Sequence, residues 1–160
     1  MPALEIFSKA KELYMEVATV DDVAKSQSKS IKLLSNQMEK EKIVAVIAEM
    51  IHDLFNYLQL HSPMSNQAII DTAKFIYIKC YDKARCIDLK MADLILFFNK
   101  IKMGEYGTIN YSTNGSYIIS SLGRYIAEKL DYYENKMELE SQINKSYRPA
   151  KLPVKTTLYK

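Results

Sequence analysis

Residues 89–103 read LKMADLILFFNKIKM, and five consecutive apolar residues, Leu94–Phe98, lie at the centre of this stretch. A run of this kind inside a segment of helical length indicates a central helix that is buried on nearly all sides, with a buried strand as the alternative. Asp88 is placed to cap the start of the helix. Gly104 follows two lysines at the far end, where a glycine with a positive φ commonly terminates a helix.

Segments on both sides of this stretch predict the other helices. They cover about residues 2–17, a short stretch from Thr19, and then 36–60, 66–81 and 116–141. In the longer segments, apolar residues recur at spacings of three and four, which is the helical period. Ser65 is the expected cap of the helix over 66–81, because its hydroxyl can accept a hydrogen bond from an N–H group of the first turn.

Residues that form turns are scarce in this chain. The 160 residues include only four glycines and four prolines, which suits a few long helices and argues against a sandwich or barrel with many turns. The sequence therefore predicts an all-α protein, a bundle of about five helices. Residues 1–144 form the helical domain of this prediction, and residues 145–160 form an extended basic tail.

The last predicted helix carries a continuous apolar stripe. Its members are spaced three and four residues apart, close to a heptad repeat: Ile119, Leu122, Ile126, Leu130, Tyr133 and Met137. Such a stripe either packs on the core of its own chain or forms a coiled-coil seam between two chains. Packing within the chain is the favoured reading, and a homo-oligomer stays open as the alternative.

Positive charge is concentrated at the C-terminal end. The chain carries a net charge of +3, and the last sixteen residues hold five lysines and arginines and no acid. Lysine and arginine neutralise phosphates and aromatic rings stack on bases, so this tail is a candidate for binding nucleic acid. The candidate residues are Lys145, Tyr147, Arg148, Lys151, Lys155 and Lys160. Docking on a protein as an extended peptide, or a solvated end without a partner, are the alternatives.

The sequence contains no recognisable catalytic or metal-binding set. His52, His61, Cys80 and Cys86 do not have the paired spacing of zinc ligands. Glu49 and His52 have the Glu-x-x-His spacing of di-iron bundles, but such sites need two copies and further glutamates. A phosphate-binding glycine loop is also missing. We therefore expect no metal, no cofactor and no enzymatic activity.

Features that would place the chain in a membrane or outside the cell are also lacking. No apolar run is long enough for a transmembrane helix, and the first residues do not resemble a secretory signal. The two cysteines are five residues apart in largely helical sequence, which is typical of thiols in a reducing compartment. A cytoplasmic protein that is not inserted in a membrane is the expectation.

Four segments between residues 41 and 136 resemble a known family. They are FNYLQL at 55–60, MSNQAIIDTAKFIYIKCY at 64–81, MADLILFFNKIKMGEYG at 91–107 and SYIISSLGRYIAEK at 116–129. The layout is similar to small helical proteins of Bacteroidetes phages and mobile elements. Their shared mark is an acid before an apolar helix, then K-x-G-x-Y-G, then a helix with L-x-x-Y. The matching positions are Asp93, Phe97, Phe98, Lys102, Gly104, Tyr106, Gly107, Leu122 and Tyr125.

The resemblance implies a role in DNA replication, because this family is similar to phage replisome organisers and helicase loaders. A non-catalytic adaptor in the host cell is then expected, binding a replicative helicase or another replication protein and also single-stranded DNA. The alternatives are a structural or cargo protein of the virion and an inhibitor of a host defence protein. The segment TINYSTNG after Gly107 is longer and more polar than in the family.

The K-x-G-x-Y-G mark also has a physical interpretation. Gly104 ends the buried helix and Gly107 lets the chain turn with a positive φ. Tyr106, held between them, is directed either onto the core or toward a partner. Lys102, Gly104, Tyr106 and Gly107 are therefore the candidate partner-binding residues, with a purely structural turn as the alternative.

Overall fold

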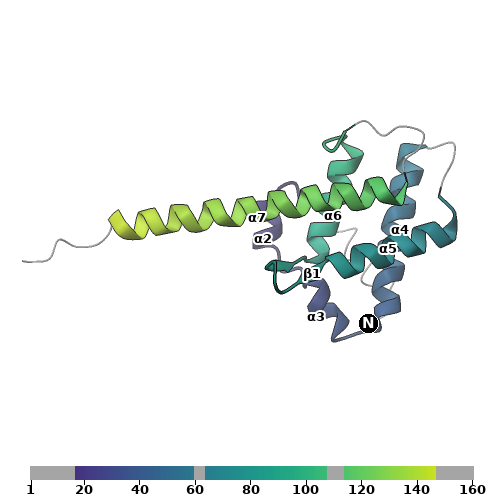
Figure 1. The fold of residues 1–160 in the computed structure, drawn as a ribbon, viewed down its shortest axis with the longest axis horizontal. Coiled ribbons are helices and arrows are strands. Elements are labelled where there is room, and N and C mark those ends of the chain that lie inside the picture. Colours follow the sequence, from purple (N-terminus) through teal and green to yellow (C-terminus); the bar gives the residue numbers. More distant parts are fainter. Residues whose placement is uncertain (1–16, 60–63, 108–113, 147–160) are drawn as a thin grey trace, which may run out of the picture.

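The structure is a computed structural model that describes residues 17–59, 64–107 and 114–146. Its elements are α2 (Val20–Lys25), α3 (Ile31–Ser35), α4 (Lys40–Leu58), α5 (Asn66–Lys79), β1 (Tyr81–Asp82), β2 (Ile87–Asp88), α6 (Met91–Lys102) and α7 (Gly115–Ser146). Within the described ranges the protein is mostly helical and its one sheet is a two-stranded hairpin (Figure 1), which confirms the all-α prediction. The helix predicted over residues 2–17 lies almost wholly outside the described residues.

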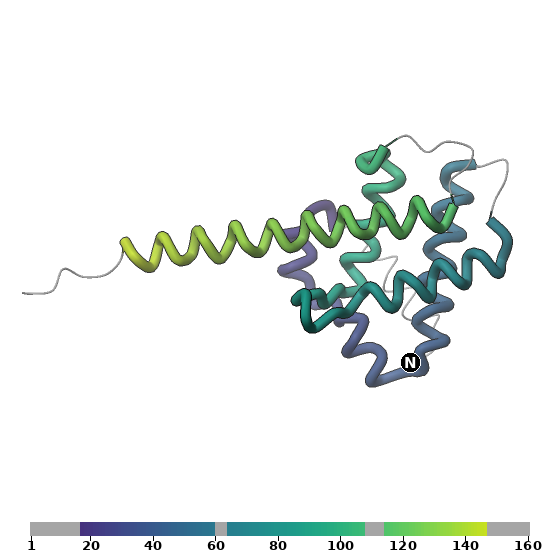
Figure 2. The backbone as a smooth tube through the Cα atoms, in the orientation of Figure 1, coloured from purple at the N-terminus to yellow at the C-terminus, as the bar shows by residue number. Residues whose placement is uncertain are grey.

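Helix α6 is the buried centre of the body. Each side chain of Leu94–Phe98 is 0% exposed, which confirms the prediction of a buried helix and rules out the strand alternative. Helices α2, α4 and α7 pack against α6, and α5 and α7 run across α4 and α6 (Figure 2). The Phe97 ring lies 5.0 Å from the Phe98 ring and 6.0 Å from the Tyr125 ring of α7. Burying an aromatic side chain of this kind stabilises the fold by roughly 1.5–3 kcal/mol.

Helix α4 matches the helix predicted over 36–60, with Ile47, Ile51 and Leu54 all fully buried. It begins at Lys40 instead of residue 36, because a separate short helix, α3, precedes it. The Ser30 hydroxyl starts α3 by accepting a hydrogen bond from the third residue of that helix, at 3.2 Å. The sequence did not predict α3, because five residues are too few to show a helical periodicity.

The predicted caps have mixed outcomes. The Ser65 hydroxyl accepts the Ala68 N–H at 3.2 Å, as expected, and Thr19 caps α2. The prediction for Asp88 is wrong, because Asp88 belongs to β2 and α6 begins three residues later. Asp93 instead accepts the N–H of Lys90 at 2.6 Å and fixes the first turn of α6.

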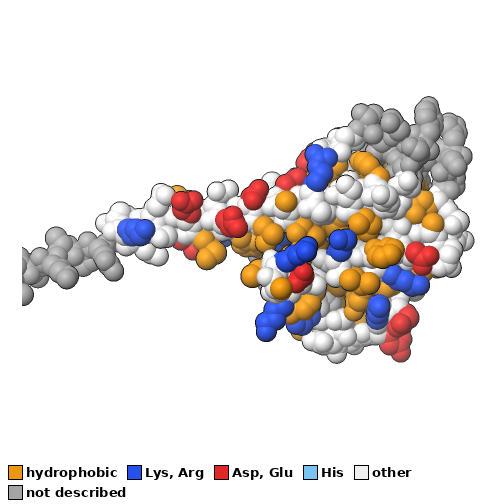
Figure 3. Space-filling model, viewed as in Figure 1, with side chains coloured by type: hydrophobic (Ala, Val, Ile, Leu, Met, Phe, Trp, Pro, Cys, Tyr) orange, Lys and Arg blue, Asp and Glu red, His pale blue; other side chains and the backbone are white. Residues whose placement is uncertain are grey.

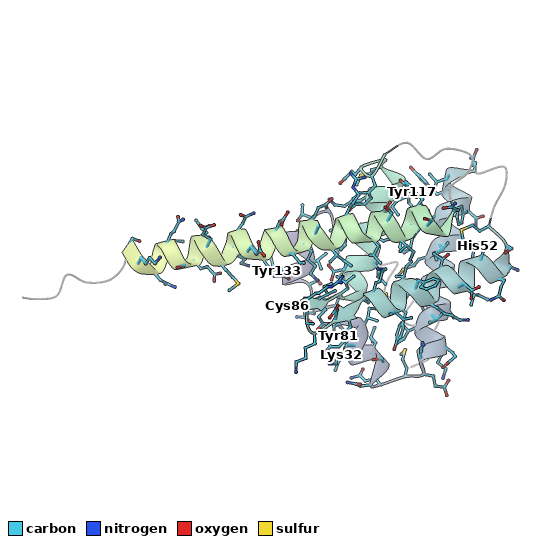
Figure 4. All side chains as sticks on the ribbon, in the orientation of Figure 1. Lys32, His52, Tyr81, Cys86, Tyr117 and Tyr133 are labelled. Carbon is cyan, nitrogen blue, oxygen red and sulfur yellow. The ribbon has the colours of Figure 1, made fainter. Side chains whose placement is uncertain are left out.

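The hairpin between α5 and α6 was also not foreseen. Helix α5 ends at Lys79 and not at residue 81, and Tyr81 then pairs with Asp88 across the antiparallel strands. Cys86 closes the turn with a φ of 55°, a conformation that the sequence did not signal by a glycine. Lys32 of α3 donates a hydrogen bond to the Tyr81 hydroxyl, so the hairpin is tied to the body (Figure 4).

Helix α7 has 32 residues and a length of about 48 Å at 1.5 Å per residue. It continues past the predicted end at residue 141 and past the predicted start of the tail, since no glycine or proline lies between residue 141 and its last residue, Ser146. Figure 1 shows that its first half lies on the body and its second half stands clear of it. We call residues 131–146 the projecting half of α7; every residue from 134 to 146 is exposed.

Candidate functional site

The K-x-G-x-Y-G turn has the predicted backbone. Gly104 and Gly107 have φ values of +76° and +112°, which are conformations that favour glycine. Tyr106 is 4% exposed and its ring lies 6.1 Å from the Phe97 ring, so it is directed onto the core. Lys102 forms an ion pair with Asp53 of α4 at 2.8 Å. These contacts explain the four residues as a turn that ends a helix, and partner binding by the turn stays a prediction.

Ion pairs and hydrogen bonds hold this turn against α7. Arg124 donates a hydrogen bond to the Tyr106 carbonyl oxygen at 3.0 Å, and its guanidinium lies 5.2 Å from the ring of that tyrosine. Lys100 forms ion pairs with Glu105 and Glu128, both at 2.9 Å. Burial, and next the nearby Glu128 carboxylate, raise the pKa of the Tyr106 phenol above its ordinary value. The turn is thus joined to α7 on several sides.

Most of the nine positions that carry the family resemblance are buried where α6 packs on α7. Six of them are at most 4% exposed: Asp93, Phe97, Phe98, Tyr106, Leu122 and Tyr125. Phe97 touches two other members, because its ring lies about 6 Å from both tyrosine rings. The shared mark is therefore explained by the packing of α6 on α7. Candidate binding residues on the outer surface have to be sought at other positions.

A buried polar network lies where these two helices meet. Asp93 is 0% exposed and accepts hydrogen bonds from the Tyr125 hydroxyl at 2.6 Å and from Lys129 Nζ at 2.7 Å. Lys129 Nζ also donates to the Asp88 carbonyl oxygen at 3.2 Å. Burial, and then the Asp93 carboxylate, raise the pKa of Tyr125. Because these groups satisfy one another's hydrogen bonds, they fix α7 on α6.

The remaining candidate ligands are not brought together. Within the described ranges, no group of three or more histidine, cysteine, aspartate or glutamate side chains is placed to hold a metal ion. His52 shares a hydrogen bond with Asn56 on α4, far from Cys86 in Figure 4. Cys80 is buried, which raises the pKa of its thiol, and Cys86 is exposed; both are free thiols. His61 lies outside the described residues.

A groove with a basic rim runs between the hairpin, the end of α5 and α7. We call it the hairpin groove; it has a volume of about 570 Å³ and is lined by Ile78, Lys79, Tyr81, Asp82, Lys83, Arg85, Ile87, Gly123 and Ile126. Figure 3 shows hydrophobic side chains gathered between α5 and α7, with lysine and arginine side chains among them. Three cations against one acid make the rim positive. The sequence did not signal this groove, because α7 is distant in the chain from α5 and the hairpin and meets them only after folding.

The projecting half of α7 presents apolar side chains to solvent. Met137 is 71% exposed, Leu139 is 59% exposed and Ile143 is 47% exposed. Leu139 and Ile143 are four residues apart and therefore share one face of the helix. A thirteen-residue exposed extension gains nothing from packing on its own body, and isolated helices of this length are marginal in water. This combination is typical of a helix that binds a partner.

At the base of the projecting half, α7 is fixed to α2. The Tyr132 hydroxyl donates to Asp21 at 2.5 Å, which raises the pKa of this tyrosine to about 12. Lys90 Nζ donates to the carbonyl oxygens of Val23, Ala24 and Ser26, so α2 is in turn held by α6. The body therefore sets the direction in which the helix leaves it.

Of the six candidate nucleic-acid-binding residues, only Lys145 lies within the described residues. Lys145 is exposed in the last turn of α7, at the tip of the projecting half. Tyr147, Arg148, Lys151, Lys155 and Lys160 lie outside the described residues. The helix thus delivers the start of the basic segment to a point well away from the body (Figure 1).

Compared with models of known families, with curated proteins and with solved structures, the chain matches none. Across the described ranges, no helix has the length and hydropathy needed to cross a membrane.

Proposed function

We propose that this protein is a non-catalytic accessory factor of DNA replication in a phage or mobile element, acting in the cytoplasm of the bacterial host. It works as an adaptor of the helicase-loader type, with the body as a scaffold and α7 as the arm that binds a replication protein. The observation that carries the proposal is the projecting half of α7, with its exposed apolar side chains.

The proposed protein contact is the face of α7 that holds Leu139 and Ile143. One helical turn separates these side chains, which suits insertion of a helix into an apolar groove of a partner, the mode in which residues four apart serve as anchors. Tyr132 lies on the same face and is anchored to Asp21, so the start of this face is held in place. A replicative helicase or a protein bound to it is the partner that the resemblance implies.

The proposed DNA contact is the basic segment that begins at Lys145. Its lysines and arginines would neutralise phosphates along a single strand, and Tyr147 and Tyr159 offer rings on which bases can stack. Because Lys145 lies in the last turn of the projecting half, DNA bound at this residue would lie close to the partner protein.

Fluorescence anisotropy with a labelled single-stranded oligonucleotide tests the DNA contact. The full chain should bind, and its affinity should fall as salt is raised, because each neutralised phosphate releases counterions. A chain that ends at Asn144, and so lacks all five basic residues of the tail, should not bind. If neither chain binds at low salt, the DNA contact is removed from the proposal; if both bind equally, the contact lies on the body.

A virion component is the second candidate, because a long exposed helix can also join subunits of an assembly. The two functions differ in the kind of self-association. An open, head-to-tail contact would build a polymer and favour the virion component, whereas a closed oligomer that binds a helicase favours the adaptor.

A further inference from the structure

Four apolar residues of the stripe on α7 are spaced symmetrically, so the spacing is the same from either end. Ile126, Leu130, Tyr133 and Met137 follow one another at intervals of four, three and four residues. We call these four residues the α7 stripe. Ile126 lines the hairpin groove and is partly buried, Leu130 and Tyr133 are half-buried beside the hairpin, and Met137 is exposed beyond the body. The stripe is thus covered at its start and uncovered at its end.

We propose that a second copy of this chain packs its α7 antiparallel on the α7 stripe, forming a two-fold dimer. The symmetric spacing fixes the register, because one alignment pairs all four residues of each helix. In that alignment Ile126 lies opposite Met137 of the partner subunit, and Leu130 lies opposite the partner subunit's Tyr133. The same patch is used on both copies, so the contact closes on itself and does not continue into a polymer.

Charge favours the antiparallel arrangement. The projecting half holds four acids, Asp131, Glu134, Glu138 and Glu140, against two lysines, which gives it a formal charge of −2. In the antiparallel pair it lies along the other copy's hairpin groove, whose rim carries Lys79, Lys83 and Arg85. A parallel pair would instead place two acidic helix halves side by side and bring two basic grooves together, which like-charge repulsion disfavours.

The dimer contact leaves the proposed partner face uncovered. At 100° per residue, Leu139 and Ile143 lie more than about 100° around the helix from the centre of the α7 stripe. The self-association does not rest on the proposed replication role, since it follows from spacing, exposure and charge alone. The two contacts can therefore be removed one at a time.

Sedimentation velocity on the full chain tests the dimer. The sedimenting mass should approach twice the 18.5 kDa of one chain as concentration rises through the micromolar range. Met137→Glu, at a site 71% exposed and therefore harmless to the fold, should raise the dissociation constant at least tenfold. Leu139→Glu on the other face of the same helix is the matched control and should leave the mass unchanged. A single-chain mass at all concentrations, or equal effects of the two substitutions, would overturn the proposal.

A charge exchange tests the groove contact. Lys79→Glu with Lys83→Glu should weaken the dimer, and so should Glu134→Lys with Glu140→Lys. Mixing the two variants should restore association, because both of the symmetric contacts in the mixed dimer then pair opposite charges again. Without that recovery the groove is not the binding site of the helix. If the groove variants lose single-stranded DNA binding while the mass stays that of a dimer, the groove is a nucleic-acid site and this contact is wrong.

Disulfide trapping tests the register. In a Cys86→Ser background, which removes the exposed native thiol, Ile126→Cys and Met137→Cys are made as two separate variants. Under mild oxidation a mixture of the two should form a covalent dimer, whereas neither variant alone should do so. Cross-linking of Met137→Cys to itself would indicate a parallel pair and contradict the inference.

Discussion

At the scale of single residues, Asp93 has the largest structural role that the sequence analysis could not assign. A lone acid before an apolar run signals that a buried carboxylate needs partners, but the sequence does not say which ones. The partners are Tyr125 and Lys129, more than thirty residues away on α7. Periodicity predicted that both helices exist, and it left their relative rotation open. The network that fixes this rotation was therefore beyond prediction.

Replacing Asp93 by asparagine should cost about 3–5 kcal/mol of the free energy of unfolding, because it leaves the ammonium of Lys129 enclosed without a counter-charge. Urea denaturation measures this loss. Asp71→Asn is the matched control: its partner Lys74 and Asp71 itself are about half exposed, so that change should cost less than about 1 kcal/mol. The double variant Asp93→Asn with Lys129→Met should recover part of the loss. Equal, small effects of both single changes would show that the network contributes little.

Tyr125 should make the fold sensitive to alkali. Its pKa is raised in the folded state, so the folded protein holds the phenol proton more tightly than the unfolded chain does. Its contribution is complete below the unfolded pKa of about 10 and is lost as pH rises toward the folded value. The free energy of unfolding should thus fall above about pH 10, and in Tyr125→Phe it should fall less steeply, by up to about 1.4 kcal/mol per pH unit. Parallel pH profiles of the two proteins would contradict this assignment.

At the scale of elements, the long helices followed from the sequence and the short connections did not. The apolar periodicity of α4 and the uninterrupted apolar run of α6 are local signals, and both helices were predicted with their buried residues. The α3 helix and the hairpin over 81–88 depend on tertiary contacts. Ile31 N–H bonds to the Leu89 carbonyl oxygen at 2.8 Å, and this joins two segments that are distant in the sequence.

Two glycines should respond to alanine in opposite ways. Gly104→Ala places a side chain at a φ of +76°, which should cost about 1–2 kcal/mol by left-handed backbone strain. Gly123→Ala lies within α7 with open space around the added methyl, so it should gain up to about 1 kcal/mol from helix propensity. Thermal unfolding at a low protein concentration compares both with the parent chain. A neutral Gly104→Ala would mean that the turn after α6 does not need its left-handed residue.

At the scale of the whole molecule, the sequence predicted a bundle but not its projecting arm. A stripe at helical spacing has the same appearance whether it is covered by its own chain or by another one. In α7 the stripe packs on the core of its own chain at Leu122, which is buried, and is open to contact with another chain at Met137, which is exposed. The hairpin groove was equally hidden, because α5, the hairpin and α7 meet only after folding. The candidate interaction surfaces therefore emerge from the packing, and the replication partner is a proposal that rests on the family resemblance.

We propose that the face of α7 that holds Leu139 and Ile143 binds a replication protein. This contact is tested most directly by measuring the binding of the labelled full chain to the replicative helicase of its host by sedimentation. Leu139→Glu with Ile143→Glu should reduce the affinity at least tenfold, and Glu138→Gln with Gln142→Glu, at exposed positions of the same helix, should leave it nearly unchanged. If the helicase still binds after the first pair of substitutions, or if the parent chain does not bind it, the proposed contact is wrong.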